Sequence, residues 1–188
     1  MIYDPVIQLP ERFLAENMSG HSKWSKIKHQ KDITDKKKGQ LFSKLSKLIS
    51  LAARKGPNPE RNLELKNAIE QARSFNMPSD NIERAVKKVS DKSSAQLEEL
   101  LIEAIGPGNI ALRIKAITDS RNRTIAEIKN ILADHASKMV PPGSISWMFS
   151  QQIAIEDPGI QTQIDKLFEA LDDHADVEDV TSNLQDQI

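Results

Sequence analysis

Apolar positions in the first half of the chain recur with the period of an α-helix. Between residues 41 and 52 they lie three to four apart, at Leu41, Phe42, Leu45, Leu48, Ile49 and Ala52. This spacing predicts an amphipathic helix that ends at the sequence GPNP (56–59), because glycine suits a helix C-terminus and proline cannot continue the hydrogen-bond ladder. Two further helical faces follow, one around Leu65 and Ile69 and one around Ile82 and Val86. The first half therefore predicts a three-helix bundle that ends near residue 90.

Polar residues at the breaks predict where the second and third helices begin. Asn58 is expected to cap the second helix, with Pro59 at its first position. Asp80, with Glu83 three residues later, resembles a capping box at the start of the third helix.

After residue 97 the period of the apolar positions changes to two. The runs LLIEAI and IALRIKAIT flank the turn sequence GPGN (106–109), an arrangement typical of a β-hairpin. In the second run Arg113 and Lys115 alternate with apolar residues, which predicts a sheet with one wet face. A helical face follows at residues 125–135, and alternation returns at Ile145, Trp147 and Phe149. That alternation predicts a third strand with Trp147 in the core.

The last part of the chain predicts one more helix, around residues 164–171, and a final strand, VEDVTS. The order strand, strand, helix, strand, helix, strand is typical of an α+β domain with its helices on one face of an antiparallel sheet. We therefore expect a three-helix N-terminal domain and a four-stranded antiparallel α/β sandwich domain with two helices on one face. The expected divisions are a loose extension (1–17), a basic helical domain (18–92) and an acidic α+β domain (93–188).

Composition narrows the class of protein. Hydrophobic residues make up 38% of the chain and charged residues 28%, which is typical of a globular protein. The chain has no cysteine, so disulfides and thiolate chemistry are excluded. Neither an apolar run of membrane-spanning length nor a signal-peptide pattern is present in the sequence. We expect a cytoplasmic protein.

The net charge of −1 hides two opposite halves. Residues 18–56 hold eleven Lys/Arg and two Asp/Glu, a net charge of +9, whereas residues 93–188 hold seven and sixteen, a net charge of −9. A basic arm on an acidic body is typical of proteins that bind a polyanion. Ten of the eleven basic residues are lysines, which act as point charges without the bidentate fork of arginine, and this favours phosphate contact over base reading.

Five sequence segments carry a family resemblance: MSGHSKWSKIKHQK (18–31), NMPSDNIERAVKK (76–88), GPGNIAL (106–112), TDSRNRTIAEI (118–128) and GSISWMF (143–149). In this order they closely resemble the YebC/PmpR family of probable transcriptional regulators, whose mitochondrial relatives are translational activators. The resemblance implies a helical N-terminal domain, a basic surface for nucleic acid and α+β domains behind it, with no catalytic centre. Residues 1–17 precede the usual start of the family, and from the resemblance we expect that this chain lacks most of the third domain that family members carry after residue 149.

The residues expected to contact nucleic acid come from the basic arm, from the first helix and from the turn after the hairpin. They are His21, Lys23, Trp24, Lys26, Lys28, His29, Lys31, Lys36, Lys37, Lys47, Arg54, Arg121 and Arg123. Trp24 has two interpretations: it stacks on an unpaired base, or it pins the arm onto the helical bundle. Arg121 and Arg123 at a helix start, with Arg113 and Lys115 on the sheet, form either a second phosphate contact or a solvated turn.

The sequence predicts no enzyme, no cofactor and no metal. His21 and His29 stand eight residues apart, which is not the spacing of a helical metal pair, and the lysines around them repel cations. We expect a regulator of gene expression that binds DNA, or alternatively a translation factor that binds ribosomal RNA and assists the synthesis of proline-rich stretches. The acidic end is interpreted as a solvated helix face, as the site of a basic protein partner, or as a segment that folds back on the basic arm. The oligomeric state stays open.

Overall fold

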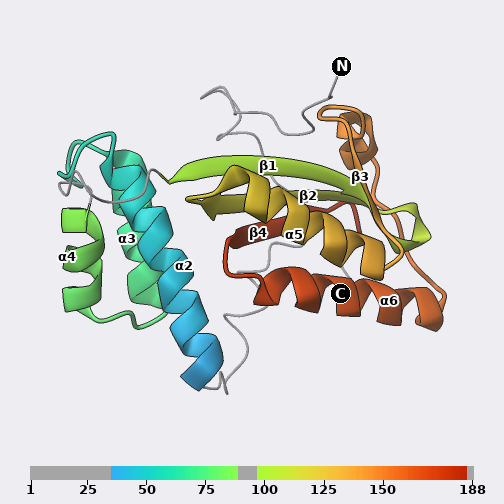
Figure 1. Ribbon diagram of the computed structural model, residues 1–188, viewed down its shortest axis with the longest axis horizontal. Coiled ribbons are helices and arrows are strands. Elements are labelled where there is room, and N and C mark those ends of the chain that lie inside the picture. Colours follow the sequence, from blue (N-terminus) through green and yellow to red (C-terminus); the bar gives the residue numbers. More distant parts are fainter. Residues whose placement is uncertain (1–34, 89–96, 186–188) are drawn as a thin grey trace. The chain divides into compact units, whose positions relative to one another are not determined.

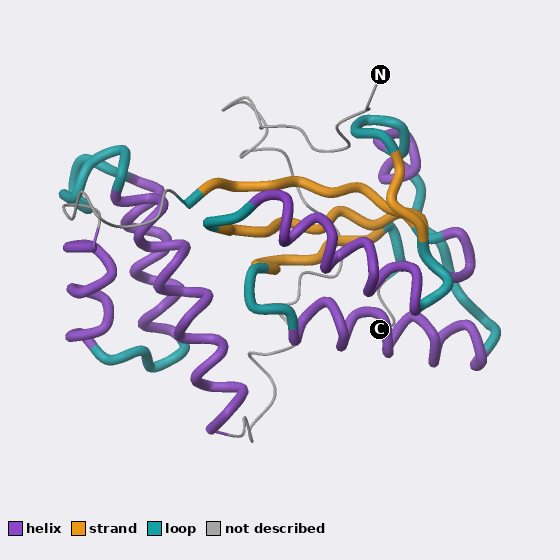
Figure 2. Tube along the Cα trace, viewed as in Figure 1, coloured by secondary structure: helices purple, strands orange, loops and turns teal. Residues whose placement is uncertain are grey.

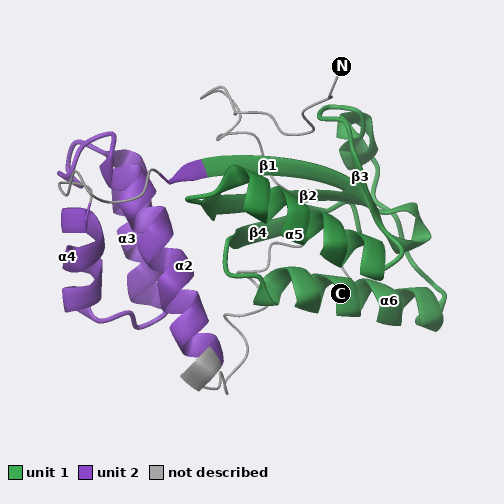
Figure 3. Cartoon of the chain, in the orientation of Figure 1, with its two compact units in different colours: residues 1–29, 99–188 green, residues 30–98 purple. Residues whose placement is uncertain are grey.

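The computed structural model describes residues 35–88 and 97–185, which belong to two compact units that divide between Glu98 and Glu99 (Figure 3). One unit is helical and the other combines helices with a sheet, so the predicted α+β class is confirmed. The domain boundaries proposed at residues 18–92 and 93–188 stay predictions, because residues 1–34 and 89–96 lie outside the described ranges.

The helical unit contains α2 (Asp35–Ala53), α3 (Leu63–Ser74) and α4 (Ser79–Lys87) (Figure 1). Helix α2 packs against both of the other helices, and its apolar face buries Leu45 and Ile49 completely, as α3 buries Leu65. The three helices predicted from the apolar period are therefore present. Both predicted caps are wrong.

Asn62, and not Asn58, caps α3. Its Oδ1 accepts a hydrogen bond from the Leu65 amide at 3.1 Å, while its Nδ2 donates to the carbonyl oxygens of Ala52 and Gly56, each at 2.8 Å. The side chain thus provides hydrogen-bond partners both for an amide at the start of α3 and for carbonyl groups at and after the end of α2, which explains why it is buried. Asn58 instead accepts from the Glu60 amide within the connecting turn.

The expected capping box of α4 is absent because the helix begins one residue before Asp80. Pro78 occupies the N-cap position, and its carbonyl accepts from the amides of Asn81 and Ile82. Asp80 therefore lies in the first turn, where its negative charge favours the positive end of the helix dipole.

The α+β unit is built on one antiparallel sheet of order β3-β1-β2-β4 (Figure 2). Its strands are β1 (Glu98–Ile105), β2 (Ala111–Thr118), β3 (Lys138–Val140) and β4 (Val177–Ser182). The predicted hairpin joins β1 and β2 through the short turn η3 (Pro107–Asn109). At its tip Gly108 has φ 67°, and a Cβ there would lie 2.8 Å from Ile155 Cδ1, so both the backbone and the packing require glycine.

Helices α5 (Arg121–Asp134) and α6 (Pro158–Asp173) cover one face of this sheet, as predicted (Figure 1). The core between them is continuous and aliphatic. It contains Leu100, Ile102 and Ala104 of β1, Leu112, Ile114 and Ala116 of β2, Ile128 and Leu132 of α5, Ile164, Leu167 and Leu171 of α6, and Val177 and Val180 of β4.

The third strand lies at Lys138–Val140, and the strand predicted from the alternation of Ile145, Trp147 and Phe149 is wrong. The chain there forms a short 3-10 turn, η4 (Ser146–Ser150), closed by bonds such as that from the Met148 amide to the Ile145 carbonyl at 2.9 Å. Three alternating apolar positions were too few to tell a strand from such a turn. Ile145 is buried, but Trp147 is 65% exposed, so its predicted place in the core is also wrong.

Candidate nucleic-acid interface

The helical unit carries an excess of positive charge on its surface. Residues 35–88 hold thirteen Lys/Arg against six Asp/Glu. On α2 the side chains of Lys37 and Lys38 are exposed, and that of Lys47 is half-buried. Arg54, in the turn after α2, is also exposed, and its guanidinium donates to the Leu97 carbonyl. Lys38 Nζ stands 5.8 Å from the centre of the Phe42 ring, a cation–π distance that leaves its charge at the surface.

The solvent-facing arc of α2 is narrower than its apolar period suggested. Helices α3 and α4 both pack on α2, so Lys44 and Ser50 are buried, and Ser50 Oγ donates to the Ala85 carbonyl at 2.8 Å. Periodicity identifies the main buried face of a helix, but a second neighbouring helix extends that face across polar positions.

Much of the predicted interface lies outside the described residues. This applies to His21, Lys23, Trp24, Lys26, Lys28, His29 and Lys31, and to the side chain of Lys36. Their contact with nucleic acid remains a prediction from the sequence.

In the α+β unit, Arg123 is surrounded by carboxylates. Its Nη2 lies 2.7 Å from Asp176 Oδ2 and 3.1 Å from Asp119 Oδ1, and its Nε lies 3.9 Å from Glu127 Oε2. The pKa of the Arg123 guanidinium is raised, mainly by its hydrogen bond to Asp176 and next by the negative charge of the Asp176 carboxylate. Arg121, at the first position of α5, is half-buried. A phosphate contact by these two arginines stays a prediction, and at Arg123 it would compete with three carboxylates.

Arg113 and Lys115 also face carboxylates, on the side of the sheet away from α5 and α6. Arg113 Nε lies 3.1 Å from Glu103 Oε1, and its guanidinium stacks 4.2 Å from the centre of the Phe149 ring. Lys115 Nζ lies 3.2 Å from Glu99 Oε1 and 3.1 Å from Glu178 Oε2. The face predicted to be wet is therefore charged but half-buried.

Burial and charge oppose each other at Lys115 and Glu178. Burial alone would lower the pKa of Lys115, but the attraction of Glu178 and then of Glu99 outweighs it, so the pKa is raised. Burial raises the pKa of the Glu178 carboxyl, and the nearby Lys115 ammonium only partly offsets this. The Lys115 ammonium thus opposes the effect of burial on the Glu178 carboxyl, and it lies between two carboxylates that the sheet partly shields.

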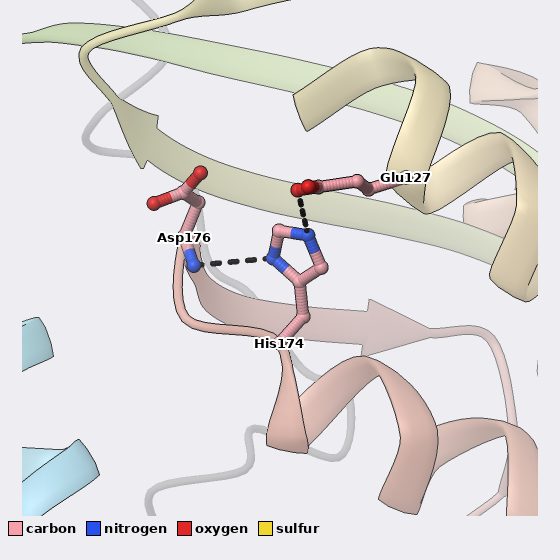
Figure 4. A group of neighbouring side chains, drawn as sticks. All are labelled: Glu127, His174 and Asp176. Atoms are coloured by element: carbon pink, nitrogen blue, oxygen red, sulfur yellow. Dashed lines mark hydrogen bonds and ion pairs between the residues drawn. The ribbon is translucent and has the colours of Figure 1, made fainter. Parts of the chain in front are cut away.

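One group of side chains has the composition of a metal site: Glu127 of α5, with His174 and Asp176 between α6 and β4 (Figure 4). Its ligand atoms already have partners. His174 Nδ1 accepts the Asp176 amide at 3.1 Å, which leaves the proton on Nε2, 2.9 Å from Glu127 Oε2. Asp176 Oδ2 accepts from Arg123 and, at 2.7 Å, from Thr124 Oγ1. This group is a hydrogen-bonded ion-pair network, and the Arg123 cation within it disfavours a metal.

Sequence reasoning missed the carboxylates that hold these cations. Glu99 and Glu103 alternate with apolar residues on β1, as Arg113 and Lys115 do on β2, so cross-strand pairing in the predicted hairpin was the available signal. Asp176 and His174 had no comparable signal, because their partners on α5 are about fifty positions away in sequence.

Among the helices of the described ranges, none combines the length and the apolar character needed to span a bilayer.

Comparison with known proteins identifies one family. Residues 22–92 match a family model described as the TACO1/YebC protein N-terminal domain, and residues 97–160 match one described as the TACO1/YebC second and third domain. A probable transcriptional regulatory protein of Halothermothrix orenii is 46% identical over 137 residues, which are 72% of this chain and 54% of that protein. A protein of the same description from Dictyoglomus turgidum is 42% identical over 167 residues, which are 87% of this chain and 66% of that protein.

The chain spans between 54% and 66% of the length of these two relatives. Among solved structures, a conserved hypothetical protein of Aquifex aeolicus matches with a TM-score of 0.77 and 28% sequence identity. That match covers 88% of this chain and 98% of the Aquifex chain.

Proposed function

The chain belongs to the TACO1/YebC family, and from this premise we propose that it is a non-enzymatic, nucleic-acid-binding regulator of gene expression of the YebC/PmpR type. The first candidate target is DNA, because the curated relatives are described as probable transcriptional regulatory proteins. The proposed interface is the helical unit together with the basic arm before it. The proposed place of action is the cytoplasm.

The observation that carries this proposal is the charge balance of the two units: residues 35–88 hold thirteen basic and six acidic residues, whereas residues 99–185 hold seven and fourteen. On α2, Lys37 and Lys38 stand at the surface of a unit with excess positive charge. In the α+β unit, Arg113, Lys115 and Arg123 are held by carboxylates. Because phosphate binding requires cations that are free to exchange small counterions for a polyanion, the helical unit is the better candidate.

A second candidate target is RNA, including ribosomal RNA. The lysine bias of residues 18–56 favours it, because lysine contacts phosphate groups without discriminating between bases. A protein that binds in this way gains little sequence preference on duplex DNA, and it suits a target that is recognised by shape and charge.

Two matched triple variants test the position of the interface. In the first, Lys23, Lys37 and Lys38 are changed to Gln, and in the second, the exposed Lys129, Lys138 and Lys166 of the α+β unit are changed to Gln. Both variants lose three positive charges. The first should lower the slope of log affinity against log salt by about 2 to 3 on duplex DNA, since each lost phosphate contact removes about 0.9.

The second triple variant should leave this slope within about 0.5 of the wild-type value, because none of its lysines contacts phosphate in the proposed interface. Titrations of a labelled duplex and a labelled single strand at several salt concentrations measure both slopes. Equal losses in the two variants would show that net charge alone matters, and they would contradict the proposed interface.

Competition distinguishes the two targets. A promoter-specific regulator should prefer its own duplex to scrambled duplex by about a thousandfold or more. Equal binding to scrambled duplexes, together with sedimentation with ribosomes at physiological salt, would exclude the transcriptional role and favour the RNA target.

A further inference from the structure

Trp147 is a large aromatic side chain that the fold presents to solvent. It lies in η4, the orange turn that follows β3 in Figure 1, and it is 65% exposed. In the described ranges the other large apolar side chain with such exposure is Leu63, at the start of α3 in the helical unit. The neighbours of Trp147 in sequence, Met148 and Phe149, are half-buried.

The turn that carries Trp147 is fixed on the sheet by polar side chains. Glu103 Oε2 accepts from the Gly143 amide at 2.7 Å, and Arg113 Nη2 donates to Ser146 Oγ at 3.1 Å. The Arg113 guanidinium also stacks on Phe149, which lies two residues after Trp147. Both ends of η4 are therefore anchored through the Arg113–Glu103 pair.

Asn183 anchors the same turn from the C-terminal side. Its Nδ2 donates to the carbonyl oxygens of Met148 and Gln151, at 3.2 and 3.3 Å, while its Oδ1 accepts from the Ala111 amide at 2.8 Å. Asn183 is buried. The backbone of the turn that carries Trp147 is thus held in place, which reduces the conformational entropy that the turn loses when a ligand binds.

The chemistry around Trp147 favours a flat aromatic ligand over a protein surface. The exposed residues beside it in sequence are Ser146, Ser150, Gln151 and Gln152, which are polar and uncharged. A protein interface needs a broader apolar centre around such an anchor, whereas a nucleobase needs a single ring face and polar groups at its edge. The exposed Lys138 of β3 adds a cation to the same unit.

We propose that Trp147 is a stacking platform for an unpaired nucleobase of a single-stranded nucleic acid, presented by the ordered turn η4. This inference rests on the proposed function and makes it more specific. The helical unit supplies the phosphate contacts, and η4 supplies a contact that only unstacked bases reach. Preference for single-stranded over duplex targets follows, because every base of a duplex is already stacked on its neighbours.

Fluorescence gives a direct test, because the chain has two tryptophans. In a Trp24→Phe variant of the full chain, Trp147 is the sole tryptophan, and its emission is selected from that of the one tyrosine by the excitation wavelength. A single-stranded RNA of about twelve nucleotides should quench its emission, whereas a duplex of the same sequence should not. Single-stranded DNA should behave like the RNA, since the base ring is the ligand.

Affinity measurements complete the test. Trp147→Ser should lose about tenfold in affinity for single strands and less than about twofold for duplex, and Trp147→Tyr should retain most of the binding. The loss should be the same at 50 and at 200 mM salt, because stacking releases no counterions. Leu63→Ser is the matched control for removal of an exposed apolar side chain. Thermal unfolding of each variant should be unchanged.

Three results would overturn the inference in distinguishable ways. If the wild-type chain binds single strands and Trp147→Ser binds them equally well, the stacking platform is wrong while the proposed function survives. If the wild-type chain binds neither single strands nor duplex at low salt, both proposals fail. An equal loss of single-strand and duplex affinity in Trp147→Ser would also exclude base stacking as the role of this side chain.

Discussion

The two units differ in the sign of their charge and in how deeply their ion pairs are buried. Ion pairs of the helical unit, such as Lys55–Glu64 and Lys87–Glu83, are exposed, whereas those on the sheet are partly buried. Residues 35–88 hold thirteen basic and six acidic residues, whereas residues 99–185 hold seven and fourteen. In the helical unit, Lys37 and Lys38 are exposed. In the α+β unit, the cations Arg113 and Lys115 lie on carboxylates that the sheet partly buries, so they contribute to the fold and less to the external field. The position of a charge, more than its number, therefore separates a binding surface from a structural network.

The largest effect that tests this comparison is expected at Lys115. Lys115→Gln leaves the Glu99 and Glu178 carboxylates without their cation. Loss of one partner of a fully buried ion pair costs about 3–5 kcal/mol of unfolding free energy, and because Lys115 and Glu99 are half-buried we expect about 3 kcal/mol here. Lys129→Gln, at an exposed position of α5, should cost less than about 0.5 kcal/mol. Urea unfolding, with amide hydrogen exchange to separate the two units, measures both values.

The deficit of Lys115→Gln should shrink in acid. The folded-state pKa of Glu178 is raised, so its ionisation in the folded protein opposes stability as the pH increases above the unfolded-state value. Without Lys115 this cost is larger, and it disappears as the pH falls through the raised pKa and the carboxyl becomes protonated. A deficit that is constant between pH 7 and pH 4 would show that the lysine acts through packing and not through charge.

An intermediate change in unfolding free energy is expected when a glycine is replaced by alanine, and its sign should differ between one glycine of each unit. Gly108→Ala in the hairpin turn combines a left-handed backbone with a Cβ that approaches Ile155 and Ile160, and should destabilise by about 2–3 kcal/mol. Gly39→Ala in α2 meets no neighbouring atom within 4 Å and should stabilise by about 0.5–1 kcal/mol. Gly143→Ala is a control for backbone strain without steric contact, because Gly143 has φ 80° and no atom within 4 Å of an added Cβ. If it costs as much as Gly108→Ala, backbone strain alone explains the effect.

Apart from the control variants, the smallest destabilisation is expected at Asn62, an uncharged residue that joins α2 to α3 in the basic unit. Asn62→Ala removes the cap of α3 and the donors to Ala52 and Gly56, and should cost about 1–2 kcal/mol. Because no titrating group is involved, the loss should be the same from pH 5 to pH 8, unlike that of Lys115→Gln. Asn58→Ala, in the exposed turn nearby, should cost less than half as much by the same hydrogen-exchange measurement.

Long periodic segments made most of the fold predictable. Six apolar positions in α2 and the alternation along β2 identified their elements, since burial on one face imposes a regular spacing. Short segments contain too few positions for their secondary structure to be identified from such a spacing. The strand Lys138–Val140 is three residues long and is specified by its pairing with β1, at Glu103↔Val140 for example, and the sequence gives no local sign of that pairing.

The sequence predicted the net charge of each unit, but it did not predict which carboxylates pair with which cations. Segment charge identified the basic helical unit and the acidic α+β unit. It did not reveal that Arg123 lies on Asp176, because that contact forms only when α6 brings β4 beside β2. Trp147 was placed wrongly for a related reason. Aromatic residues are usually buried, and the polar anchors that turn this one outward, Arg113 and Asn183, are distant in sequence.

Asn183 also has a consequence for how the protein can vary. Its backbone pairs with both Ala111 and Ile153, and its side chain reaches β2 and η4, so the C-terminal strand and the surface turn before α6 are fastened by one residue. We therefore expect substitutions in these two segments to depend on one another. A chimaera that exchanges residues 177–185 with those of a relative should exchange the turn as well. A protease that trims the chain back to Ser182 would remove the Asn183 anchor and leave the turn held by Arg113 and Glu103 alone.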